Sequence, residues 1–178
     1  YGDEVIAAIS IVQRVFMIAA SLVGGIGQGF QPVCGFNYGA KLFARVKAGF
    51  RFSLAAMTNP LLPLVVVGFI FAPQIIALFR PDDALLKEIG SKAFRYQCLT
   101  VPLLGWVTIN NMLMQTIGKA FKASLLAISR QGLFLLPLLF LLTPLLGLTG
   151  ILVSPPAADI CTFIMSIPLS ISVFREMR

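Results

Sequence analysis

Five long apolar runs restrict this chain to a membrane fold. They lie at residues 5–30, 52–71, 93–115, 125–146 and 150–174. Each is long enough for the roughly 20 helical residues that cross about 30 Å of hydrocarbon. Because lipid offers no hydrogen-bond partners to the backbone, a run of this kind must satisfy its own N–H and C=O groups, which a helix does. We therefore expect an all-α integral membrane protein with five transmembrane helices.

The composition indicates the same class of protein. Hydrophobic residues make up 58% of the chain and charged residues 12%, against about 25% charged residues in a typical soluble domain. The net charge of +7 could attract nucleic acid, but basic residues in short loops between apolar runs are what membrane insertion requires. We expect contact with membrane lipid and none with nucleic acid. The cysteines Cys34, Cys98 and Cys161 are widely separated and are expected to pack as small hydrophobic residues.

The charges of the loops predict one orientation in the membrane. The loop from Lys41 to Arg51 is purely basic, whereas residues 80–92 mix basic and acidic side chains that cancel. The positive-inside tendency places the first loop in the cytoplasm and the second outside. Another cytoplasmic loop is expected around Lys119, Lys122 and Arg130, and the C-terminus is expected inside. Tyr1 would then lie outside, so we expect an upstream helix and a longer polypeptide.

Several kinds of chemistry lack the residues that they need. The chain has no histidine and no GxxxxGK[ST] sequence, so histidine-based catalysis and P-loop nucleotide hydrolysis are not expected. No cysteine or acidic cluster has metal-ligand spacing, since the only close acids, Asp82 and Asp83, fall in a loop. We therefore expect no enzyme, no catalytic residue, no bound metal and no organic cofactor.

Asp159 is the only acid well inside an apolar run. It follows the sequence SPPAA, in which two prolines are expected to disrupt the start of the helix. Ionisable groups at membrane depth are costly and usually face a cavity or a partner. Asp159 could meet a substrate cation, take part in proton or sodium exchange, or form an ion pair that fixes helix packing. Arg14, in the first run, is a candidate partner.

Polar amides form two further groups of candidates for an ion or substrate pathway. Glycines and amides between Gly24 and Gly39 are expected to end the first helix, and the amides there are Gln28, Gln31 and Asn37. Asn110, Asn111 and Gln115 lie about one turn apart in the third run. All six could line a polar path, or they could form hydrogen bonds between helices. Aromatic and methionine side chains could bind flat lipophilic cations or simply pack.

Three stretches carry a resemblance to a known family. They are IGQGFQPVCGFNYGAK at 26–41, QTIGKAFKA at 115–123 with SRQGLFLLPL at 129–138, and GLTGILVSPPAAD at 147–159. They resemble the multidrug and toxic compound extrusion (MATE) antiporters, and the first is most similar to the branch with damage-inducible and staphylococcal-type exporters. Their order and spacing look like the last five of the family's twelve helices. The resemblance thus implies five helices of a six-helix C-terminal lobe.

The resemblance also implies a function. The full protein would exchange sodium ions or protons for organic cation drugs or metabolites by alternating access, in the bacterial inner membrane with its C-terminus in the cytoplasm. Its partner would be the N-terminal lobe of the same polypeptide. Asp159 matches the acid of the family's PxAD-like segment and is expected to be a structural or gating residue. Some members carry an ion-binding acid on the helix at 93–115, where this chain has none.

Two other functions remain open from the sequence. A lipid-linked oligosaccharide flippase of the same fold group would need more cavity cations than Arg14, Arg95 and Arg130 to meet pyrophosphate. A non-transporting membrane scaffold would use the glycines and prolines for packing alone.

Overall fold

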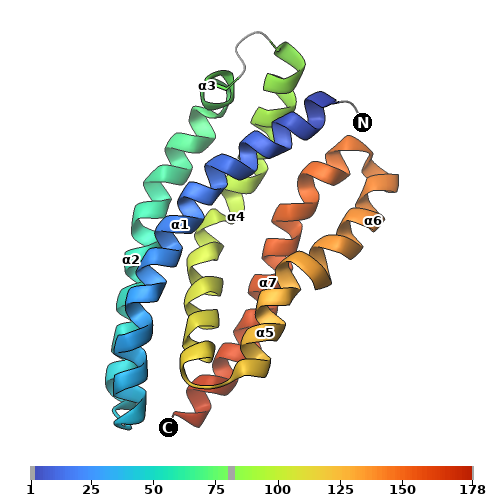
Figure 1. Cartoon of the computed structure of the whole chain (residues 1–178). Coiled ribbons are helices and arrows are strands. Elements are labelled where there is room, and N and C mark those ends of the chain that lie inside the picture. Colours follow the sequence, from blue (N-terminus) through green and yellow to red (C-terminus); the bar gives the residue numbers. More distant parts are fainter. Residues whose placement is uncertain (1–2, 80–82, 178) are drawn as a thin grey trace.

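The computed structural model describes residues 3–79 and 83–177, and their regular structure is entirely helical (Figure 1). Successive long helices run antiparallel, so the N-terminus and the C-terminus lie at opposite ends of the bundle. The predicted all-α fold is confirmed. The elements are α1 (Asp3–Gly39), α2 (Phe43–Ile70), α3 (Ala72–Ala77), α4 (Ala84–Thr116), α5 (Ala120–Ile128), the π-helical turn η1 (Ser129–Phe134), α6 (Leu135–Leu146) and α7 (Leu148–Glu176).

Helix α4 lies at the centre of the bundle and packs against α1, α2, α3, α5 and α7. Its buried side chains belong to two apolar clusters. One contains Leu113 of α4 with Met57 and Leu61 of α2, and the other contains Leu86 of α4 with Ile76 of α3. Both clusters are close-packed cores of the kind that fix helices relative to one another.

Large apolar side chains are exposed on the outer surface of the bundle, as is usual on a surface that faces lipid. Phe121 and Phe140 are each 81% exposed, and Phe36 is 76% exposed. Among the described residues, four helical segments are long and apolar enough to cross a membrane: α1, α2, the continuous run Ala120–Leu146, and α7. Helix α4 is long enough but less apolar, which its central position permits because neighbouring helices cover it. The exact membrane boundaries at 5–30, 52–71, 93–115, 125–146 and 150–174 stay a prediction.

The prediction that glycines and amides end the first helix is wrong. Helix α1 continues through that segment and through Pro32 to Gly39. At Gly27 the lack of a side chain lets α1 pack closely against α4. A Cβ there would collide with the side chain of Met112. The chain leaves the helix at Lys41, two residues after Gly39, where φ of 57° is left-handed and the Leu42 N–H donates to the Asn37 carbonyl at 2.8 Å. This is a Schellman ending with lysine where glycine is usual.

Two further expectations about helix boundaries are also wrong. Arg130 lies within the predicted run 125–146 and not in the cytoplasmic loop that its charge predicts, because it falls in the π-helical turn of the continuous helical run Ala120–Leu146. Pro155 and Pro156 do not disrupt the start of the last helix either. Helix α7 begins at Leu148 and carries both prolines inside it, so Asp159 lies well within regular helix.

Candidate functional site

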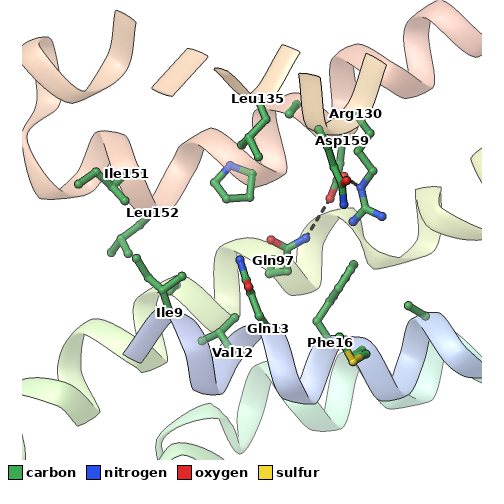
Figure 2. Close-up of a pocket in the computed structure, with 16 residues that line it drawn as sticks. Ile9, Val12, Gln13, Phe16, Gln97, Arg130, Leu135, Ile151, Leu152 and Asp159 are labelled. Atoms are coloured by element: carbon green, nitrogen blue, oxygen red, sulfur yellow. Dashed lines mark hydrogen bonds and ion pairs between the residues drawn. The ribbon is translucent and has the colours of Figure 1, made fainter. Parts of the chain in front are cut away.

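Asp159 on α7 joins three elements of the bundle. Its side chain is 8% exposed and accepts hydrogen bonds from three donors. Arg130 Nε of η1 donates to Oδ1 at 2.6 Å, while Gln97 Nε2 and Thr100 Oγ1 of α4 donate to Oδ2 at 2.9 and 3.1 Å. Figure 2 shows Gln97, Arg130 and Asp159 converging on one point. One carboxylate therefore connects α7 to η1 and to α4.

Arg130 extends the network toward α1. Its guanidinium carbon lies 5.3 Å from the centre of the Phe16 ring, within the range of a cation–π contact. Within the described part of the chain only its Nε is hydrogen-bonded, which leaves the two terminal NH₂ groups available toward Phe16. The π-helical turn inserts an extra residue into the helical repeat, and such turns occur frequently at functional sites.

The network forms part of the wall of a cavity of about 320 Å³. Helices α1 and α4 form one side of the cavity, and η1, α6 and α7 form the other. Its polar lining consists of Gln13, Gln97, Arg130, Gln131 and Asp159, and its apolar lining of Ile9, Val12, Phe16, Met17, Ala20, Ala93, Leu135, Ile151, Leu152, Pro155 and Ala158. A mostly apolar cavity with a few convergent polar groups is typical of a small-molecule site. The charges of Arg130 and Asp159 cancel, so the side chains that line the cavity carry no net charge.

Arg14 is not the partner of Asp159. It lies exposed on α1 and does not line the cavity, whereas its neighbour Gln13 does. The α1 residues that line the cavity are Ile9, Val12, Gln13, Phe16, Met17 and Ala20, so Arg14 lies at the edge of this helix face, outside the cavity wall. The expected arginine partner exists, but it is Arg130.

The family is decided by comparison with known proteins. The MatE family model matches residues 1–141. This chain belongs to the MatE family. The resemblance inferred from the motifs is therefore confirmed.

Curated relatives of this MatE chain include multidrug export proteins. MepA of Staphylococcus saprophyticus is 27% identical over 153 residues, which is 85% of this chain and 33% of that protein. MepA of Staphylococcus haemolyticus is 24% identical over 165 residues, which is 92% of this chain and 36% of that protein. The chain thus spans about one third of the length of these relatives.

Solved MATE structures share the fold. The MATE multidrug transporter DinF-BH is 29% identical, with a TM-score of 0.82 over 90% of this chain and 36% of that one. A MATE transporter in complex with MaL6 has a TM-score of 0.91 over 99% of this chain and 40% of that one, and at 18% identity it shows the fold alone.

The predicted amide candidates lie away from this cavity. Gln31 donates to Gln115 at 3.4 Å, Gln115 donates to Asn111 at 2.6 Å, and the Asn111 amide approaches the Ala123 carbonyl at 3.5 Å. These bonds connect α1, α4 and α5, which favours the interhelical alternative for the three residues.

The remaining amides are not brought together by the MatE bundle. Asn110 is fully buried and donates to the Trp106 carbonyl at 2.8 Å. Asn37 donates to the Val33 carbonyl at 2.8 Å, and Gln28 is exposed on α1. A pathway role for any of the six amides stays a prediction.

Sequence reasoning missed Gln97 and Thr100 as site residues. The available signal was Gln97, an amide inside the predicted third run, like Asn110 and Asn111. Thr100, at i+3 from Gln97, lies on the same helix face and therefore reaches the same carboxylate.

A second group of ion pairs lies near the C-terminal end of α7 and the start of α5. Glu176 of α7 forms ion pairs with Lys119 and, at 3.2 Å, with Lys122 of α5, and Lys122 also donates to Ser172 Oγ at 2.8 Å. The hydrogen bond to Glu176 raises the pKa of Lys119 above its ordinary value. In this MatE chain, α7 is therefore tied to the start of α5 at Glu176, and to η1 and α4 at Asp159.

Proposed function

We propose that this chain is part of a secondary active exporter that exchanges sodium ions or protons for organic cations by alternating access. The family membership supports this proposal, as do the names of relatives that are called multidrug export proteins. The observation that carries it is the buried Asp159 network. A charge that connects three helical elements at the wall of a cavity is a group through which ion binding can change the shape of that cavity.

The bonds of Asp159 suggest how ion binding would act. All three donors stabilise the carboxylate, so protonation or a sodium ion at Asp159 competes directly with the Arg130 guanidinium. Arg130 lies on η1, Asp159 on α7, and Gln97 on α4. Loss of the carboxylate charge therefore loosens the contacts that hold these three elements together. An ion shifts the equilibrium between two conformations only if it binds one of them more tightly. Competition with Arg130 supplies this difference in affinity, because the ion binds better where Arg130 has left the carboxylate.

The same group would also meet the substrate. A lipophilic cation in the cavity would lie against Phe16 and Met17 and would compete with Arg130 for both the Phe16 ring and the Asp159 carboxylate. Ion and substrate would then exclude each other at one carboxylate. Mutual exclusion at a shared site is one physical basis for exchange, because each ligand must leave before the other binds.

Export of a cationic dye such as ethidium from loaded bacterial cells tests this proposal in the native gene product. Asp159→Asn is expected to abolish ion-driven export while the protein reaches the membrane at its normal level. Glu176→Gln is the matched control, since it removes one paired acid from the same helix at a site away from the cavity. Export that is unchanged in Asp159→Asn removes Asp159 from the mechanism. Dependence of export on a sodium or a proton gradient identifies the coupling ion.

A further inference from the structure

A second hollow lies between α2 and α7, at the end of the bundle where α7 finishes (Figure 1). It is a groove of about 530 Å³ lined by three cations, three aromatic rings and two aliphatic side chains. These residues are Lys47, Arg51, Arg175, Phe50, Trp106, Phe174, Leu54 and Ile171. None of them lines the Asp159 cavity, so this groove is a separate site.

The positive charge of the groove is not neutralised from within. No acid is among its lining residues, and the ion pairs of the described residues include none to Lys47, Arg51 or Arg175. Glu176 follows Arg175 directly but binds Lys119 and Lys122 of α5 instead. Three cations in one groove repel one another and attract an anion.

The floor of the groove is rigid and apolar. Phe50 makes edge-on contacts with Trp106 and with Phe174, with ring centres 5.9 and 5.0 Å apart. Trp106 is fixed in turn, because its Nε1 donates to Ser166 Oγ at 2.8 Å. A free, fully hydrated anion gains nothing from such a floor, whereas an amphiphile buries its apolar part there.

An exposed aliphatic stripe continues from the groove along α7. Ile171 lines the groove, and Ile167 and Ile164 follow at helical spacing on the same face, with exposures of 48%, 37% and 59%. The stripe therefore runs from the cations toward the middle of the helix. An acyl chain lying along this stripe would place a phosphate among Lys47, Arg51 and Arg175.

We propose that this groove binds the phosphate headgroup of an anionic phospholipid, with an acyl chain along the isoleucines of α7. Basic pockets between transmembrane helices bind such headgroups where anionic lipids collect. The ligand is a lipid and not a soluble phosphate, because the cations lie above an aromatic floor and an aliphatic stripe on helices that are apolar enough to span a membrane. This proposal does not depend on the export activity.

Lipid retention by the purified native gene product tests the proposal. Detergent-solubilised protein is mixed with phosphatidylglycerol or phosphatidylcholine, and bound lipid is counted by native mass spectrometry. We expect retention of phosphatidylglycerol only. Lys47→Gln/Arg51→Gln is expected to weaken this binding roughly 30-fold, since each basic residue near an anionic lipid contributes about a factor of five. The charge-conserving Lys47→Arg/Arg51→Lys should retain it.

The matched control is Lys41→Gln/Arg45→Gln. It removes the same amount of charge from positions close to Lys47 and Arg51 in the sequence, but neither Lys41 nor Arg45 lines the groove. Equal losses in the two charge-removing variants would overturn the proposal, because they would reflect net charge alone. Displacement of the lipid by inorganic phosphate at millimolar concentration would also overturn it and would assign the groove to a soluble anion. Loss of binding in the charge-conserving variant would contradict the electrostatic argument as well.

Discussion

The Arg130–Asp159 pair makes a quantitative prediction, because its two ends differ in exposure. The side chain of Asp159 is 8% exposed and that of Arg130 is 34% exposed. Breaking a buried ion pair by removing one partner costs about 3–5 kcal/mol, most of it from the charge left behind. The identity of the charge that remains therefore decides the cost.

Arg130→Gln leaves the nearly buried carboxylate. Gln97 and Thr100 still donate to Asp159 and offset part of the loss, at about 0.6–1.7 kcal/mol for each bond in a membrane protein, so we expect about 2–3 kcal/mol of destabilisation. Asp159→Asn leaves a guanidinium that is one third exposed and still faces Phe16, so we expect about 1–2 kcal/mol. The double variant leaves no unpaired charge and should match the milder single variant. The size of the coupling energy then equals the loss in Arg130→Gln, about 2–3 kcal/mol.

Equilibrium unfolding in mixed micelles, followed by circular dichroism, measures these free energies. The control cycle uses Glu88 and Lys92 of α4, an exposed i,i+4 pair at 2.8 Å, for which a much smaller coupling energy is expected because solvent screens the two charges. Two results would refute the reasoning. Additive losses in the Arg130–Asp159 cycle would mean that the two residues do not interact, and a larger loss in Asp159→Asn than in Arg130→Gln would mean that exposure does not set the cost.

Two further predictions concern glycine geometry and use the same unfolding assay. Lys41→Gly should stabilise the protein by about 0.5–1 kcal/mol, because glycine adopts the left-handed φ of 57° without strain. Lys41→Ala removes the charge but keeps the Cβ, so it should not stabilise the protein. Equal effects of the two substitutions would mean that loss of the charge is responsible. Gly150→Ala should destabilise the protein by about 2 kcal/mol, since its Cβ would collide with the Leu142 backbone carbonyl. Gly27→Ala should destabilise it less, because the colliding Met112 side chain can move. A larger loss in Gly27→Ala than in Gly150→Ala would contradict this argument.

Hydropathy alone predicted where the helices of this chain are, but not where they end. Apolar runs of about 20 residues leave helix as the solution for a single membrane-crossing segment. The end of α1 depends instead on tertiary packing, which local propensity does not contain. Gly27 lies against Met112, and Gln31 binds Gln115, so contacts with α4 outweigh the cost of glycine and amide residues in that helix.

The Asp159 site was half predicted for a related reason. An acid inside an apolar run signals a partner, and its cost in lipid makes the inference secure. The identity of the partner depends on the rotation of each helix about its axis and on the depth of each side chain in the membrane. Arg14 does not line the cavity, and the sequence does not show on which side of its helix the cavity lies. Arg130 falls inside the predicted run 125–146, but its basic charge also predicts a cytoplasmic loop, and only the structure shows that it pairs with Asp159. The positive-inside tendency counts charges and carries no information on which of them are paired.

The pairing pattern shows that basic residues at one end of this bundle have different roles. Lys119 and Lys122 are held by Glu176, so they fix α5 against α7 and offer little charge to a ligand. Lys47, Arg51 and Arg175 line a groove without an acid, so their charge is available. Arg130 lies inside the bundle, and its charge is matched by the only acid there among the described residues. The count of Lys and Arg in the loops predicts topology. The local presence or absence of an acid determines whether a cation stabilises a helix pair, binds an anion or can be displaced by a competing cation.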